Sequence, residues 1–166
     1  MDELKKRWQI TALIAAAMIA SVFAYLAVAE VLKQSGNFQG GPVAGDQMRM
    51  LRIIIFVIAI GDALFSFIIK GFLLKGADIP QGVDENLIVP VLAQKLQYST
   101  IVVMAFCESV AIFGLVLFML TGSSTDFYIL LALSLALMVV HFPRLDKWRD
   151  FIIEKQTSSI ISQGKI

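Results

Sequence analysis

The sequence predicts an all-α fold, a four-helix transmembrane bundle that forms a single integral membrane domain over residues 1–166. Three observations support this prediction. Of the 166 residues, 58% are hydrophobic and only 16% are charged, whereas soluble domains average about 45–50% apolar and about 25% charged residues. The mean hydropathy is +0.79. Four apolar stretches reach or approach the roughly 20 residues that a helix needs to cross a bilayer.

The four apolar stretches are residues 10–32, 53–74, 99–120 and 127–142. Because a backbone in lipid must satisfy its own hydrogen bonds, runs of this length form helices rather than strands. The last stretch is short. The mixed-charge tail that follows it, residues 144–166, indicates an amphipathic segment at the membrane surface that frays from residue 156 onward.

Turn-forming residues fill the connections between these stretches. Residues 34–49 and 76–97 each read as a polar loop, and residues 121–126 read as a tight polar turn. Within the second loop, residues 87–92 can begin an early helical turn.

The first stretch has an alternative interpretation as a cleaved signal peptide. Basic residues 5–7 precede an apolar run that ends in Ala27-Val28-Ala29, which is the order of a signal peptide and its cleavage site. Since the apolar run is long for a signal peptide, we expect a retained span.

The basic residues predict the orientation. Eleven of the 14 fall on one side of the predicted spans: Lys5, Lys6, Arg7, Lys70, Lys75, Lys95, Arg144, Lys147, Arg149, Lys155 and Lys165. The other three, Lys33, Arg49 and Arg52, fall on the opposite side. Basic residues favour the cytoplasmic side. We therefore expect an integral protein of a bacterial-type inner membrane with both termini in the cytoplasm, and Trp8 and Trp148 at that interface.

Two acidic residues lie where acids are costly. Asp62 and Glu108 are each nine residues into their spans, 53–74 and 99–120, so both lie about 13–15 Å deep if the helices run antiparallel. A charge at the bilayer centre costs at least about 2.5–3.5 kcal/mol, and such a residue usually faces a partner or a water path. Desolvation and a nearby second carboxylate both favour the protonated form of a carboxylic acid, and a proton carrier needs a group that changes between its two forms.

Two hydroxyls are candidates for the same site. Ser66 is one turn after Asp62, and Ser109 is next to Glu108, so both are predicted to contribute to a proton or sodium site. Alternatively, each acid is only a protonated or hydrogen-bonded anchor between helices, and Gly61 suggests a close helix approach beside Asp62.

The stretch 105–116, AFCESVAIFGLV, resembles the carboxylate helix of the c subunit, or proteolipid, of rotary ATPases. That family places a Glu or Asp in mid-membrane, followed by small and apolar residues and then by an aromatic-Gly-Leu-Val run. The preceding loop with Pro80 is also similar, so the partial match covers about residues 80–121. The resemblance implies reversible protonation or sodium binding at Glu108, and sodium-dependent members have a hydroxyl where this chain has Ser109.

Three features differ from that family. Its inner helices pack through repeated glycines, which allow backbones to approach closely, whereas the stretch 53–74 has only Gly61 and Gly71. That stretch also lacks the glutamine that sodium-dependent members use. Four-helix proteolipids carry the carboxylate on the last helix, and here it is on the third.

A weak internal repeat relates residues 9–28 to residues 97–116 at an offset of 88, with five of seven compared pairs identical. It suggests two helical-hairpin repeats, in which Ala20 occupies the position of Glu108. Apolar helices also produce such matches by chance.

Other chemistry is not indicated. With only Cys107 and His141 as cysteine and histidine, we expect no disulfide, no metal site, no cofactor and no catalytic residues, hence no enzyme. The net charge of +1 does not attract nucleic acid. His141, just before Pro143, is expected to cap a helix or lie at the interface, and Tyr25 is expected to pack.

Three functional hypotheses remain, all with the lipid bilayer as a partner. The first is a proton- or sodium-carrying subunit with Glu108 as carrier and Asp62 as its neighbour. The second is a structural or assembly subunit of a larger membrane complex. The third is a small cation/proton exporter, although Ala105, Ala111 and Ile112 offer no aromatic cage near Glu108. We expect a homo-oligomer or a subunit of a membrane complex.

Overall fold

The computed structural model describes residues 2–35, 45–75 and 85–162, which form five helices and contain no strand. The helices are α1 (Asp2–Gln34), α2 (Asp46–Lys75), α3 (Glu85–Thr121), α4 (Ser124–His141) and α5 (Leu145–Ser162). The first four are long and apolar enough to cross a membrane. The prediction of an all-α, four-helix transmembrane bundle is therefore confirmed. Pro80, Lys165 and residues 36–44 and 76–84 of the two predicted polar loops lie outside the described residues.

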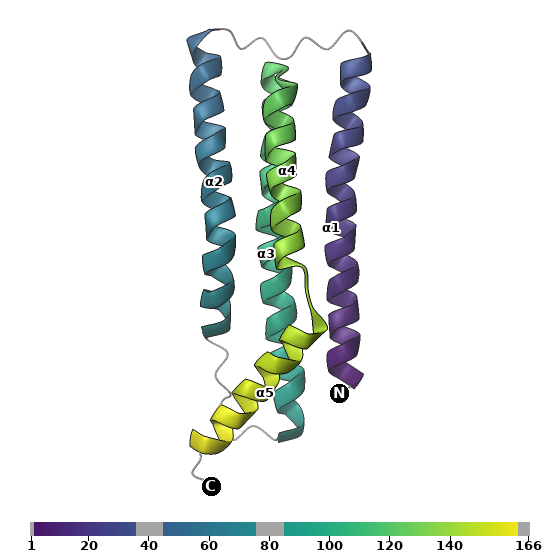
Figure 1. The fold of residues 1–166 in the computed structure, drawn as a ribbon, viewed down its shortest axis with the longest axis vertical. Coiled ribbons are helices and arrows are strands. Elements are labelled where there is room, and N and C mark those ends of the chain that lie inside the picture. Colours follow the sequence, from purple (N-terminus) through teal and green to yellow (C-terminus); the bar gives the residue numbers. More distant parts are fainter. Residues whose placement is uncertain (1, 36–44, 76–84, 163–166) are drawn as a thin grey trace.

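Helix α3 is the centre of the bundle. It packs against α1, α2 and α4, whereas α1 and α2 lie on opposite sides of it (Figure 1). Of the two predicted hairpins, α3 and α4 pack closely, while α1 and α2 each pack on α3 instead of on each other. Helices α1 to α4 alternate in direction, and α5 runs obliquely across the end of the bundle at which α1 begins (Figure 1).

The outward faces of the flanking helices are strongly apolar. Leu13 of α1 is 72% exposed, and Phe72 of α2 is 74% exposed. Exposed apolar surface on this scale is typical of contact with lipid or with another protein. These four apolar helices make the chain a small polytopic membrane protein.

Helix α3 begins earlier than predicted. The polar residues and Pro90 predicted a loop up to residue 97 in which residues 87–92 can begin a helical turn. That early turn is confirmed and extended, because the chain is helical from Glu85 onward. Pro90 is the sixth residue of this helix, where a proline removes a backbone hydrogen bond and its ring crowds the preceding turn. Ile88, Leu92 and Leu96 recur every four residues on one face and are buried, so packing favours the helix.

The C-terminal tail forms the partner of this extension. Trp148 and Ile152 of α5 pack with the buried face of α3 and with Leu4 of α1 in a second apolar cluster. The expectation of fraying from residue 156 is wrong, because α5 continues to Ser162. Trp148 is 4% exposed in this cluster, and its expected position at the membrane interface stays a prediction.

The connection between α3 and α4 is shorter than the predicted turn. Only Gly122 and Ser123 separate the two helices, and Gly122 has a positive φ of 71°. Below this turn the helices approach closely at Gly114, where a Cβ would lie 3.0 Å from Leu130 Cβ. The close approach expected at Gly61 is absent, since a Cβ there would have nothing within 4 Å.

Candidate functional site

Glu108 points from α3 toward α1. The hydroxyl of Tyr25 donates a hydrogen bond to Glu108 Oε1 at 2.9 Å, and the hydroxyl of Ser21 donates to the same oxygen. Both donors come from α1, where they are four residues apart and so share one helix face. The carboxylate is partly buried between the two helices.

Ser21 has a second acceptor within reach. Its Oγ lies 2.6 Å from the carbonyl oxygen of Met18, one turn earlier in α1. A hydroxyl has one proton to donate and lone pairs that accept. Ser21 can therefore donate either to Glu108 or to its own helix.

Asp62 forms a similar pair on the other side of α3. Ser109 Oγ lies 2.6 Å from Asp62 Oδ2 and 2.8 Å from the carbonyl oxygen of Phe106. Since Ser109 follows Glu108 directly, the two acids lie at the same level of the bundle. They are hydrogen-bonded to different partners, Glu108 to α1 and Asp62 to α3.

An exposed strip of α3 runs between the two acidic sites. On a helix, positions 105, 112 and 116 lie between the directions of positions 108 and 109. Ile112 is 41% exposed and Val116 is 39% exposed. Each carboxylate thus lies beside a surface that faces outward from the bundle.

Ser66 is not part of either acidic site. Its hydroxyl is completely buried and donates to the carbonyl oxygen of Ala63 at 2.7 Å. Its neighbour across the helix interface is Cys107. Ser66 does lie one helical turn after Asp62, as its spacing in the sequence predicts. That spacing does not determine which group the Ser66 hydroxyl contacts.

His141 and Cys107 form a buried contact between α4 and α3. His141 Nδ1 lies 3.0 Å from the carbonyl oxygen of Leu137 and 3.9 Å from Cys107 Sγ. The imidazole also packs on Phe67, with ring centroids 4.7 Å apart. Packing against α2 and α3 buries the imidazole, and its contact with the Leu137 carbonyl in the last turn of α4 agrees with the expected capping role. The described residues contain no cluster of three metal-ligating side chains.

Sequence reasoning missed the two hydroxyl donors to Glu108. Tyr25 was expected only to pack, and the sequence neighbours of Glu108 suggested no aromatic side chain near the carboxylate. The sequence did contain one indication of this site. Ser21 and Tyr25 are four residues apart, so their hydroxyls lie on the same face of an otherwise apolar span.

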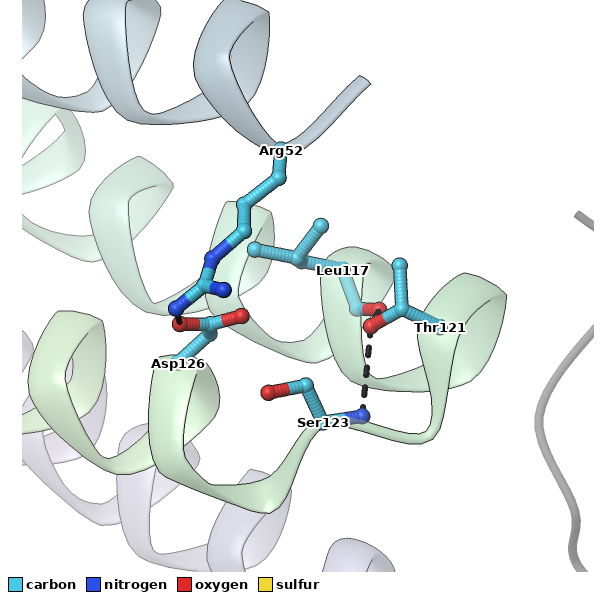
Figure 2. Close-up of polar contacts among 5 residues, drawn as sticks. All are labelled: Arg52, Leu117, Thr121, Ser123 and Asp126. Carbon is cyan, nitrogen blue, oxygen red and sulfur yellow. Dashed lines mark hydrogen bonds and ion pairs between the residues drawn. The ribbon is translucent and has the colours of Figure 1, made fainter. Parts of the chain in front are cut away.

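A third carboxylate, Asp126, was also missed. It lies in the first turn of α4, is 1% exposed, and forms an ion pair through Oδ1 with Arg52 of α2 (Figure 2). The positive end of the α4 dipole adds to the stabilisation of this negative charge. The two residues are 74 positions apart in the chain, and no local pattern pairs them.

Comparisons with known proteins found no matching family model, no matching curated protein and no matching solved structure. The resemblance of the stretch 105–116 to the rotary ATPase c subunit thus stays a prediction.

Proposed function

We propose that this membrane protein carries protons or sodium ions, and that Glu108 takes up and releases the ion in the middle of its span. The observation that carries the proposal is the position of the Ser21 hydroxyl, which reaches both the Glu108 carboxylate and the Met18 carbonyl. The proposed role is that of an ion-carrying subunit similar to the proteolipid of rotary ATPases.

Hydroxyl partners suit a carboxyl group that changes its charge. When Glu108 is ionised, Ser21 and Tyr25 donate hydrogen bonds to it. When Glu108 is protonated, the Ser21 hydroxyl can turn toward Met18 and accept the carboxyl proton, because a hydroxyl is both donor and acceptor. In both states Glu108 Oε1 and the hydroxyls of Ser21 and Tyr25 stay hydrogen-bonded, and an unpaired polar group is costly in lipid.

The Asp62 pair has the same property. Ser109 reaches both the Asp62 carboxylate and the Phe106 carbonyl. We assign Asp62 a supporting role, because its position beside Ser109 lets its charge influence Glu108 at the same level. For sodium, the oxygens of Glu108, Ser21 and Tyr25 supply three ligands from one side.

The test is ion flux through proteoliposomes that contain the purified protein. We expect a pH-driven or sodium-driven flux with the natural chain and at least a tenfold loss with Glu108→Gln, which keeps the size and hydrogen-bonding capacity of the side chain. Asp150→Asn serves as the matched control, since it neutralises an exposed carboxylate of α5 outside the proposed site and should retain flux.

Hydrophobic carbodiimide labelling separates the two ions. This reagent reacts with protonated carboxyl groups in lipid, so we expect labelling of Glu108 that is lost in Glu108→Gln. Protection by sodium, but not by potassium, indicates sodium binding, whereas indifference to both indicates protons. Full flux with Glu108→Gln, together with failed partner association in Glu108→Leu, would instead support a structural or assembly subunit.

A further inference from the structure

A second polar site lies at the end of the bundle opposite the one at which α1 begins. A cavity of about 300 Å³ opens between the first turns of α2 and α4 and the last turn of α3. Its polar lining residues are Arg49, Arg52, Thr121, Ser123 and Asp126. This volume is at the lower end of the range for small-molecule pockets.

Asp126 has an unused hydrogen-bond acceptor in this site. Its Oδ1 is paired with Arg52, but its buried Oδ2 receives no hydrogen bond from the described residues. Figure 2 shows the Asp126 carboxylate beside the Arg52 guanidinium, with its second oxygen on the side of Thr121 and Ser123. The Thr121 hydroxyl donates to the Leu117 carbonyl at 2.7 Å and accepts from the Ser123 backbone N–H at 3.2 Å, so Thr121 does not supply the missing donor.

The charges around the cavity select the ligand class. Arg49 and Arg52 together with Asp126 leave a net charge of +1, so a simple cation is disfavoured. Arginine favours phosphate, and the side chain of Arg52 is 53% exposed and accessible while it is held by Asp126. A phosphate alone leaves Asp126 Oδ2 without a donor, whereas a ligand with both a phosphate and an ammonium group satisfies both partners.

The surroundings favour a lipid as the source of this ligand. The cavity lies where apolar spans end, which is the level of lipid headgroups. On α2, Ile53 follows the two arginines and is 56% exposed, and Val57 one turn later is 64% exposed. Acyl chains can therefore follow the outer face of α2 while the headgroup occupies the cavity.

We propose that this cavity binds the headgroup of a phospholipid with a primary ammonium, as in phosphatidylethanolamine. The phosphate contacts Arg49 and Arg52, and the ammonium donates a hydrogen bond to Asp126 Oδ2. Phosphatidylcholine has the same phosphate, but its quaternary ammonium carries no N–H to donate. Phosphatidylglycerol has the phosphate and no ammonium. Discrimination among the three lipids thus tests both halves of the site.

The experiment is native mass spectrometry of the purified full chain in detergent, with one of the three lipids added at a time and equal acyl chains. We expect at least fivefold more bound phosphatidylethanolamine than either other lipid. Asp126→Asn should reduce phosphatidylethanolamine binding to the level of phosphatidylcholine, and Arg49→Gln should weaken binding of all three. Arg149→Gln, an equal charge change on an exposed residue of α5 at the opposite end, should have no effect.

Several results would overturn the proposal. Equal binding of the three lipids shows that headgroups are not distinguished, and unchanged preference in Asp126→Asn shows that the carboxylate does not select the ammonium. Displacement of the lipid by free phosphoethanolamine at similar concentration shows a soluble ligand instead. Arg49 is exposed, so its variant remains informative even if Asp126→Asn does not fold.

Discussion

Glu108 and Asp126 are both carboxylates at helix interfaces, but their partners are opposite in kind. Glu108 meets two hydroxyls from α1, whereas Asp126 meets a guanidinium from α2. A guanidinium stays charged at all relevant pH values, and an opposite charge favours the charged form of a carboxyl group in general. Hydroxyls can accompany either form of a carboxyl group. An acidic residue inside an apolar helix is therefore not by itself evidence of an ion carrier. The side chains that contact the carboxyl group determine whether both its charged and its neutral form can be accommodated.

The largest expected effect comes from removing the guanidinium. Arg52→Gln leaves the buried Asp126 without its countercharge and should reduce the free energy of unfolding by about 3 kcal/mol, at the lower end for a broken buried pair because Arg52 is half exposed. Reversible unfolding in mixed micelles measures this change. The double variant Arg52→Gln with Asp126→Asn should recover most of the loss. No recovery would show that the ion pair is not the cause.

The next prediction distinguishes the contact between α3 and α4, near Asp126, from the contact between α1 and α3, which holds Glu108. In Gly114→Ala the new Cβ lies 3.0 Å from Leu130 Cβ, so α4 must shift, at a cost of about 1–2 kcal/mol. We expect a lower unfolding free energy and weaker lipid selection at Asp126, with unchanged carbodiimide labelling of Glu108, which faces α1. Gly61→Ala is the control, because its Cβ meets nothing. Equal effects of both substitutions would contradict the close approach at Gly114.

A smaller effect is expected at Glu108 itself. Tyr25→Phe removes one hydrogen bond to Glu108 Oε1 and should reduce stability by about 1 kcal/mol, within the range for hydrogen bonds between membrane helices. The same variant should change the rate of carbodiimide labelling at Glu108, measured by mass spectrometry of peptides. If Tyr25→Phe lowered the free energy of unfolding as much as Arg52→Gln does, the contrast between the Glu108 and Asp126 sites would be contradicted.

The smallest effect belongs to Asp62. Ser109→Ala removes the hydroxyl donor and should cost about 0.6 kcal/mol, the average for such bonds in a membrane protein. Labelling of Asp62 should change in this variant. Ser66→Ala should leave it unchanged, since the Ser66 hydroxyl donates to Ala63. The reverse pattern would place Ser66, and not Ser109, at Asp62.

The sequence was sufficient for the spans and for the level of the acids, because both follow from counting residues along straight helices. It was not sufficient for the partners of Glu108, because the direction of a side chain depends on how helices pack. Ser21 and Tyr25 are 87 and 83 residues away from Glu108 in the chain. The one indication in the sequence is that Ser21 and Tyr25 are four residues apart, which puts both hydroxyls on the same face of α1.

The errors in the fold have a similar origin. Pro90 and its polar neighbours favour a loop locally, but burial of Leu92 and Leu96 against α5 favours a helix. Gly61 was expected to mark a close approach, yet Gly114 does so, because α4 packs on that face of α3. In each case a long-range contact determines the outcome, and local sequence does not report it.

The most direct test of the central claim is infrared difference spectroscopy of the reconstituted protein between acidic and alkaline buffers. Because other carboxyl groups also protonate in acid, the signal of Glu108 is the difference between the natural chain and Glu108→Gln. That difference should contain the carbonyl band of a protonated carboxylic acid that appears and disappears with pH, and Asp126→Asn should retain this band. Identical pH-dependent bands in the natural chain and in Glu108→Gln would contradict reversible protonation of Glu108.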